Sequence, residues 1–302
     1  MLDILICIIP KILPDAPTVG PSLLKSHLEQ NNFLNMKDIE SIYGTSAGAI
    51  IGILICLNYD WETINDYIIK RPWHDVFSIK VQNIFDAYTK KGIFDIKTIE
   101  KCFKPLLDAK DISMDINLTD FYNLSRIELH LFSFEINEYK VQDISYLTHP
   151  NLSLMTAVQM TCGLPILVTP VCIDDKCYID GGVFCNYPLN YCIESGRSLD
   201  EILGIKNKYC SEPPIINAGS TIMDYLLGFI YKAVFSVNTD HNQSQLKNEV
   251  VCDVKSLSVE VLRSALNSID VRRELHSSGV ASATTFLSNL EDSVEKLVER
   301  IL

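Results

Sequence analysis

Basic residues are scarce in this chain: 26 lysines and arginines stand against 38 aspartates and glutamates in 302 residues. The resulting net charge of −12 repels phosphate backbones and anionic headgroups alike. It excludes nucleic-acid binding and a polybasic membrane anchor as properties of the chain as a whole, although local basic patches stay compatible with it. The densest patch interleaves lysines with Asp95 and Glu100, which is typical of a solvated helix face. Its lysines are Lys90, Lys91, Lys97, Lys101 and Lys104.

Long apolar runs and targeting signals are also lacking. No apolar stretch approaches the ~20 residues that cross a bilayer, because Asp224 and Lys232 interrupt the longest candidate, 222–237. Residues 1–10 are apolar but have no basic leader and no small-residue cleavage site, so we expect a buried strand over 2–9. The sequence therefore predicts a protein without a transmembrane segment, placed in the cytoplasm or at the periphery of a membrane.

No two cysteines have the C-x-x-C spacing, although the chain has ten cysteines. Disulfide frameworks are typical of short secreted chains, whereas these cysteines are scattered through a long one. The cluster from Cys162 to Cys192 matches no zinc pattern, and the six histidines lie apart from it in the sequence. We therefore expect reduced, packed thiols, with no metal and no other cofactor.

A large apolar fraction is present: 47% of the residues are hydrophobic and only 21% are charged, which indicates a thick core. Strands are expected at 39–43, 126–134 and 138–144, and helices at 21–31 and 47–57. Asp95 and Ser153 are expected to cap two further helices. Alternation of strands and helices predicts an α/β fold with parallel strands.

No linker rich in glycine, serine or proline and no internal repeat divides the sequence. We therefore expect a single domain over 1–302. Its core should span about 1–205, followed by a mainly helical C-terminal layer over about 206–302.

The segment Gly44-Thr45-Ser46-Ala47-Gly48 lies between the apolar runs 39–43 and 49–57. A strand, a sharp glycine-flanked turn and a helix form a nucleophile elbow, which lifts a serine hydroxyl clear of the backbone. Gly44 and Gly48 avoid crowding in such a turn. An ordinary tight β-to-α turn is the alternative interpretation. This placement makes Ser46 the candidate nucleophile and the N–H of Ala47 a candidate oxyanion donor.

A serine hydroxyl needs a base within hydrogen-bond reach. Asp180 ends an apolar strand and precedes Gly181 and Gly182, which lack side chains and so allow a second backbone to approach. An aspartate of ordinary pKa, ~3.9, is a weak base at neutral pH, so this pairing requires desolvation or tight alignment. A histidine-dependent serine esterase is a further alternative, although no histidine lies in a recognisable partner motif. The histidines are His27, His74, His130, His149, His241 and His276.

Together these motifs resemble the patatin-like phospholipase family, whose members pair a G-x-S-x-G serine with an aspartate in D-G-G or D-G-A. The run from Thr161 to Pro165, followed by Pro170, is similar to the family's S-x-A-x-P-x-x-x-x-P, with Gly163 replacing alanine. Asn186-Tyr187-Pro188 is similar to the N-x-P that follows D-G-G. The resemblance covers roughly 22–191 and, more loosely, 275–287. It implies a three-layer α/β/α fold with a mainly parallel central sheet and a helical C-terminal region.

The resemblance also implies a lipid acyl hydrolase, with Ser46 as nucleophile and Asp180 as general base. Such an enzyme cleaves fatty-acyl esters of lipids or phospholipids through an acyl-enzyme and needs no cofactor. The expected partner is a lipid ester, with transient contact to a membrane or lipid aggregate. The apolar helix candidate 222–237 could supply that contact or an acyl groove, with core packing as the alternative.

One departure from the family pattern lies near the start of the chain. Family members open with G-G-G-x-K/R-G, whose backbone N–H groups form the oxyanion hole, whereas residues 9–20 keep only Gly20. Loss of one such donor costs about 3 to 4 kcal/mol of barrier. The alternative function is therefore a catalytically impaired relative that binds a lipid or a protein partner.

Overall fold

The computed structural model describes residues 4–8, 36–209, 215–222, 224–226, 228–230, 232, 246–254 and 259–301. The helix expected at 21–31 and the candidate donor Gly20 lie outside the described residues, as do His27 and His241.

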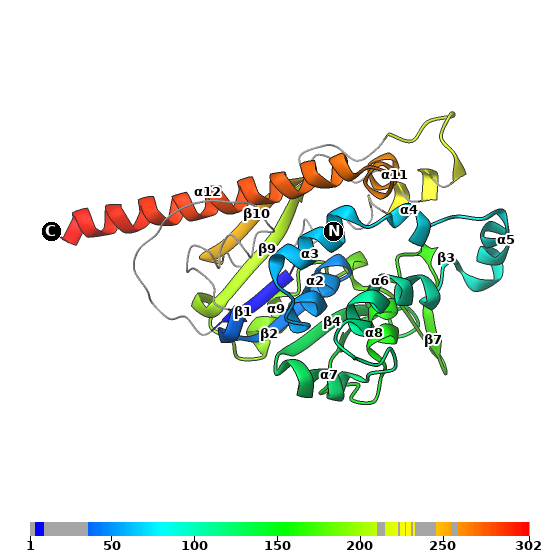
Figure 1. The fold of residues 1–302 in the computed structure, drawn as a ribbon, viewed down its shortest axis with the longest axis horizontal. Coiled ribbons are helices and arrows are strands. Elements are labelled where there is room, and N and C mark those ends of the chain that lie inside the picture. The colour runs from blue at the N-terminus through cyan, green and yellow to red at the C-terminus, as the bar shows by residue number, and fades with distance from the viewer. Residues whose placement is uncertain are drawn as a thin grey trace.

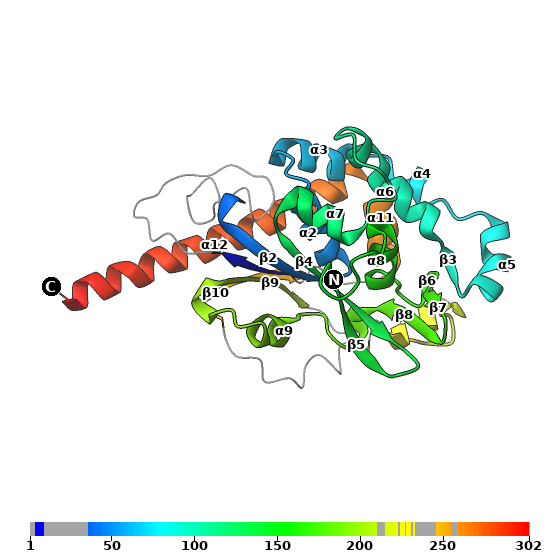
Figure 2. The ribbon, with the colours of Figure 1, turned by 90° about the horizontal axis from the view of Figure 1, so that it is seen from below.

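A twisted sheet crosses the molecule in the strand order β10-β9-β1-β2-β4-β8-β7, with β5 paired to β4 (Figures 1 and 2). Its strands are β1 (Ile4–Ile8), β2 (Ile39–Thr45), β4 (Glu128–Glu135), β5 (Lys140–Ile144), β7 (Val171–Ile173), β8 (Lys176–Asp180), β9 (Ile202–Tyr209) and β10 (Asn248–Val254). A separate two-stranded sheet pairs β3 (Gly92–Phe94) with β6 (Ile166–Val168).

The main sheet is mixed, which corrects the expectation of a mainly parallel one. β2 pairs in parallel with β4, as the strand–helix alternation predicted, and β9 pairs in parallel with β10. β1 is antiparallel to both of its neighbours, β2 and β9, and β8 is antiparallel to β4. The hairpins β4–β5 and β7–β8 are antiparallel because a short turn can join strands only in that direction.

Helices lie on both faces of this sheet. The helices are α2 (Ala47–Cys56), α3 (Trp61–Lys70), α4 (Trp73–Val76), α5 (Val81–Lys90), α6 (Ile96–Asp108), α7 (Leu118–Ser125), α8 (Leu154–Thr161), α9 (Leu189–Glu194), α11 (Val259–Asn267) and α12 (Ile269–Ile301). Short 3₁₀ turns are η1 (Met36–Asp38), η2 (Gly181–Val183) and η3 (Leu199–Glu201). Figure 2 shows α2, α3, α7 and α8 on one face and α9 on the other. The expected α/β class with helices on both sides of the sheet is therefore confirmed.

Two apolar cores follow from this layering. The larger one packs α2, α6, α7 and α8 against the sheet and includes the fully buried Ile53, Leu107 and Leu131. The smaller one lies on the α9 face around Phe132 and Leu189.

Local capping residues in the sequence predicted where two of these helices begin. Asp95 accepts a hydrogen bond from the N–H of Lys97 and begins α6, whose Phe103 and Leu106 face the core. Ser153 accepts from the N–H of Thr156 and begins α8. Both expected N-caps are confirmed. The expected lysine patch is not one helix face, because Lys90 ends α5 whereas Lys97, Lys101 and Lys104 belong to α6.

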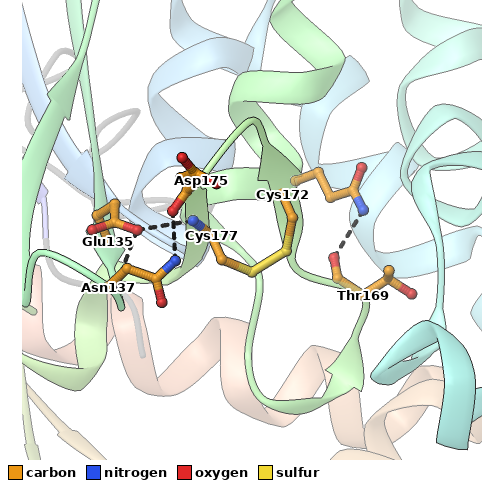
Figure 3. Close-up of a disulfide and its surroundings, with 7 residues drawn as sticks. Glu135, Asn137, Thr169, Cys172, Asp175 and Cys177 are labelled. Carbon is orange, nitrogen blue, oxygen red and sulfur yellow. Dashed lines mark hydrogen bonds between the residues drawn. A yellow bond between two sulfur atoms is a disulfide. The ribbon is translucent and has the colours of Figure 1, made fainter.

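The expectation of reduced cysteines is wrong at the β7–β8 hairpin, where Cys172 and Cys177 form a disulfide (Figure 3). The two residues are direct cross-strand partners, with Cα atoms 4.1 Å apart. The C-x₄-C spacing alone does not predict the bond, because the register of the hairpin is what places the two cysteines opposite each other. Glu135 accepts a hydrogen bond from the N–H of Cys177 (2.8 Å) and thereby ties this hairpin to the end of β4.

The C-terminal part of the chain continues the sheet before it becomes helical. The expected core boundary near residue 205 falls inside β9, and β10 extends the sheet beyond it. α12 then runs along β10 and α3, and its C-terminal end extends past the sheet (Figure 1). Within the described residues, every helix is too short or too polar to cross a bilayer.

Candidate active site

Strand register brings the two candidate catalytic residues together. Thr45, the last residue of β2, pairs with Phe132 of β4, and Ser46 follows it directly. The next residue of β4, Ser133, pairs with Asp180 at the end of β8. Ser46 and Asp180 thus leave neighbouring strands on either side of β4, although 134 positions separate them in the sequence.

The hydroxyl of Ser46 donates a hydrogen bond to Oδ2 of Asp180, with 2.6 Å between the two oxygens. Oδ1 of the same carboxylate accepts the N–H of Gly182 at 2.8 Å. Asp180 is buried, whereas Ser46 is partly exposed. The geometry therefore joins the hydroxyl of a partly exposed serine to a buried carboxylate that a second hydrogen bond orients.

Ser46 lies in the sharp turn that the motif predicts. Its backbone has φ 54° and ψ −119°, a conformation that residues with a side chain rarely adopt. The turn is tight enough that a Cβ on Gly44 would lie 2.8 Å from the carbonyl carbon of Gly48. A strained serine between a buried strand and a helix matches the nucleophile elbow.

Two buried hydroxyls hold this arrangement, and the sequence analysis did not identify their roles. Thr161 accepts the N–H of Ser46 at 3.0 Å and donates to the carbonyl of Phe132 at 2.6 Å. Ser133 lies within hydrogen-bond distance of the carbonyls of Met160 (2.9 Å) and Ile179 (2.7 Å). One hydroxyl thus fixes the residue that bears the candidate nucleophile, and the other fixes the residue before the candidate base.

Glycines beside Asp180 allow close backbone packing. A Cβ on Gly181 would lie 2.4 Å from the carbonyl oxygen of Phe132, closer than any real contact. Gly163 accepts the N–H of Asp180 at 3.0 Å, and a Cβ there would lie 3.2 Å from the Cα of Ile179. The expected close approach at the D-G-G motif is therefore to β4, through Gly181.

The surroundings of Asp180 alter its acidity. Burial raises the pKa of Asp180 above its ordinary value of 3.8, while hydrogen bonds from Ser46 and Gly182 act in the opposite direction. A raised pKa makes a carboxylate a stronger base. This is the desolvation that the sequence analysis required of an aspartate paired with serine.

Cys162 is a second titratable group at this site. Burial raises the pKa of its thiol well above the usual range and the charge of Asp180 adds to this, while a hydrogen bond with Ser46 lowers it. The thiol therefore stays protonated at neutral pH and does not compete with Ser46 as a nucleophile.

Helix α2 starts directly after Ser46. The helix begins at Ala47, so the N–H groups of Ala47 and Gly48 have no partner within the helix. The helix dipole favours negative charge at this end.

The histidines of the described residues lie elsewhere. His130 is buried and pairs through Nδ1 with Asp143 at 2.8 Å, and the group hydrogen-bonded to the Ser46 hydroxyl is a carboxylate, not an imidazole. Within the same described part of the chain, no three histidine, cysteine, aspartate or glutamate side chains gather as a metal site would require.

Comparison with known proteins identifies the family. The model of the patatin-like phospholipase family matches residues 23–193, which is more than half of the chain and includes both Ser46 and Asp180. The chain belongs to the patatin-like phospholipase family. The suspected resemblance is thereby confirmed.

Two curated relatives and one solved structure are similar to this family member. "Probable lipid hydrolase 463L" of Invertebrate iridescent virus 6 is 24% identical over 163 residues, which is 53% of this chain and 56% of the relative. "Uncharacterized protein R571" of Acanthamoeba polyphaga mimivirus is 23% identical over 177 residues, 58% of this chain and 57% of the relative. The matched region thus spans little more than half the length of either relative.

The crystal structure of VipD from Legionella pneumophila superimposes with a TM-score of 0.52 at 12% identity. The superposition covers 88% of this chain and 64% of VipD. At this identity the likeness shows a shared fold.

Proposed function

We propose that this protein is a lipid acyl hydrolase that cleaves fatty-acyl esters with Ser46 as nucleophile and Asp180 as general base. The observation that carries the proposal is the 2.6 Å hydrogen bond from the Ser46 hydroxyl to the buried carboxylate of Asp180. Membership of the patatin-like phospholipase family and the name of the iridescent-virus relative, "Probable lipid hydrolase 463L", support the lipid substrate class.

The geometry fits a two-step acyl transfer. Oδ2 of Asp180 takes the proton of the Ser46 hydroxyl while the serine oxygen attacks the ester carbonyl, and the carboxyl returns that proton to the departing alcohol. A water then attacks the acyl carbonyl and gives a proton to Asp180. The bond between the acyl carbon and the Ser46 oxygen breaks, the carboxyl returns the proton to that oxygen, and the fatty acid leaves. The two side chains that transfer protons, Ser46 and Asp180, both belong to this chain.

Negative charge develops on the carbonyl oxygen during both steps. The N–H groups of Ala47 and Gly48 and the N-terminal end of α2 are the donors that we assign to it. Gly20 stays a candidate for an additional donor. Fewer donors lower the rate by 10² to 10³ for each one lost, so modest turnover is compatible with this mechanism.

Labelling with a fluorophosphonate probe tests the proposal. The probe is expected to modify Ser46, which mass spectrometry of the labelled peptide locates. Ser46→Ala should abolish both labelling and the release of fatty acid from phospholipid or neutral ester substrates. Thr45→Ser is a suitable control. It changes a neighbouring residue that has a hydroxyl but is not the proposed nucleophile, and it leaves Ser46 in place.

A folded protein in which Ser46 resists the probe would favour the alternative, a catalytically impaired relative that binds lipid or protein. Hydrolysis that persists in Ser46→Ala would contradict the role proposed for Ser46 and would assign the activity to another group. The departure from the glycine-rich opening motif is the observation that supports this alternative.

Contact with a lipid surface belongs to the same proposal, because lipid esters reside in membranes and aggregates. Within the described part of the expected helix segment 222–237, Ile222 (69%) and Phe229 (64%) are exposed, whereas Leu226 and Ile230 are partly buried. The expectation that this segment is simply core packing therefore finds no support at Ile222 and Phe229.

A further inference from the structure

Helix α5 carries large apolar side chains on its solvent side. Val81, Phe85 and Tyr88 are spaced so that they share one face of the helix, and 71%, 71% and 93% of their respective surfaces are exposed. Ile79, just before the helix, is also more than half exposed. Exposed apolar stripes of this kind indicate interaction surfaces, because their side chains do not pack against the rest of the molecule.

Basic residues stand at both ends of this stripe. Lys80 precedes the helix, and Lys90 and Lys91 end it, all three exposed. Asp86 is the one acidic residue in the segment 79–91, so the segment carries a net charge of +2 within a chain of net charge −12. Lys90 and Asp86 pair at 3.3 Å. The local charge is therefore opposite in sign to that of the whole molecule.

The position of α5 relates it to the candidate active site. α5 leads into β3, which pairs with β6, and the N–H of Thr169 donates to the carbonyl of Phe94 at 2.8 Å. β6 begins three residues after Gly163, whose carbonyl accepts the N–H of Asp180. In both views α5 lies at the extremity of the molecule opposite the C-terminal end of α12 (Figures 1 and 2). The helix thus projects from the segment that borders Asp180.

We infer that α5, together with Ile79 and Lys91, docks this protein on a membrane that contains anionic lipid. An apolar stripe with aromatic side chains between lysines is the composition of helices that lie in the plane of a membrane interface. The long stems of lysines allow their charges to reach headgroups while the stripe enters the acyl region. The acidic remainder of the molecule is repelled by the same surface, which orients α5 toward it.

This inference rests on the proposed function, since it specifies the surface from which a lipid ester reaches Ser46. Its test therefore measures binding without turnover. The full chain carrying Ser46→Ala is mixed with phosphatidylcholine vesicles, with and without phosphatidylserine, and co-sedimentation gives the partition coefficient. Thermal unfolding of each variant without vesicles reports whether it is folded.

Three double variants of that chain separate the contributions. Phe85→Gln with Tyr88→Gln should weaken binding to phosphatidylserine-containing vesicles at least about tenfold, because two aromatic side chains no longer enter the interface. Lys80→Gln with Lys91→Gln should weaken it about fivefold per lysine, and added salt should remove this difference. Leu124→Gln with Leu147→Gln, two exposed apolar residues outside α5 and outside the segment 222–237, should change binding less than twofold.

Specific outcomes overturn the inference. They are a parent chain that binds neither vesicle type, an α5 variant that is folded and binds as well as the parent, and a loss of binding confined to the Leu124 and Leu147 variant. A failed fluorophosphonate reaction at Ser46 with vesicle binding intact would remove the proposed function and leave the docking surface standing.

Discussion

The hydroxyl of Thr161 joins three parts of the candidate site. It accepts the N–H of Ser46 from the elbow and donates to the carbonyl of Phe132 on β4, while its own residue ends α8. Thr161 is completely buried, so no water can replace these bonds. We regard it as a positioning residue, because it touches the backbone of the candidate nucleophile and not the reacting oxygen.

Replacement of Thr161 by valine keeps the shape of the side chain and removes both hydrogen bonds. We expect a loss of about 1 to 3 kcal/mol of stability from the two unpaired backbone groups. We also expect a lower kcat with little change in KM, because the strained turn at Ser46 loses its tether. Steady-state kinetics on one ester substrate and thermal unfolding measure these effects.

Thr161→Ser is the matched control, since it restores the hydroxyl and should recover most of kcat. A purely structural role would be indicated if valine and serine lowered kcat equally.

Asp180 connects activity and stability through its pKa. Burial raises this pKa in the folded protein, so ionisation of Asp180 opposes folding. The stability that comes from the protonated form of Asp180 is therefore fully present below the pKa of the unfolded state. It is lost as the pH rises through the higher pKa of the folded state. Activity should change in the opposite sense, because the base must be ionised.

Asp180→Asn is therefore expected to be at least as stable as the parent at neutral pH and to have its turnover lowered about 10² to 10⁴-fold. The kcat/KM of the parent should rise with pH through an inflection above 3.8, the ordinary aspartate value. A pH series of kinetics and of thermal unfolding for both proteins checks this. The assignment fails if the variant becomes progressively less stable than the parent as pH increases.

The junction of β8 with β4 depends on the absence of one side chain. At Gly181 a methyl group would collide with the backbone of Phe132, and backbone cannot give way as a flexible side chain can. Gly279 in α12 offers the contrast, because a methyl group there would meet nothing within 4 Å.

Gly181→Ala should lower stability by about 1 to 3 kcal/mol and reduce hydrolysis, because β8 must shift and carry Asp180 away from Ser46. Gly279→Ala should raise stability by about 0.5 to 1 kcal/mol, because alanine is the better helix former. Chemical denaturation of both variants measures the two effects. Equal responses at the two positions would contradict the close packing at Gly181.

Elements with local signals were predictable, and their pairing was not. The strand expected at 39–43 is β2, the helix after Ser46 is α2, and Asp95 and Ser153 cap helices as expected. These signals lie within a few residues of one another. The antiparallel pairing of β1 and β8 and the Cys172–Cys177 bond depend on register between separate segments, which no local pattern specifies.

The same distinction applies to the candidate site. The motifs predicted Ser46 and Asp180 as partners because each residue lies beside glycines, and the two side chains are hydrogen-bonded in the structure. The hydroxyls of Thr161 and Ser133 carried no comparable signal. Thr161 lies in the T-C-G-L-P segment, but its partners are Ser46 and Phe132, 115 and 29 positions away.

The long helix α12 connects the C-terminal region to the rest of the molecule through Arg272. Its guanidinium donates to the carbonyls of Ile69 (2.8 Å) and Arg71 (3.2 Å), at the end of α3. It also donates to the carbonyls of Ala265 (2.6 Å) and Leu266 (3.3 Å), in the last turn of α11. One side chain thus satisfies backbone groups that two helix ends leave without intrahelical partners.

This connection bears on the prediction of a single domain over the whole chain. If α11 and α12 fold as one unit with the α/β core, a change at their junction must shift one unfolding transition. Arg272→Met keeps the apolar stem of the side chain and removes its hydrogen-bond donors. A hydrogen bond from a charged group contributes about 1.5 to 3 kcal/mol to stability, which the variant loses. We therefore expect calorimetry to show one transition, displaced to lower temperature by several degrees.

The neighbouring Arg273 provides the matched control for this experiment. It pairs at 3.0 Å with Asp270, and both side chains are largely exposed, so Arg273→Met should leave the midpoint nearly unchanged. If Arg272→Met instead separated the calorimetric trace into two transitions, the C-terminal helices would be an independent folding unit. A midpoint that fell equally in both variants would show that the loss of positive charge, rather than the carbonyl contacts of Arg272, determines the effect.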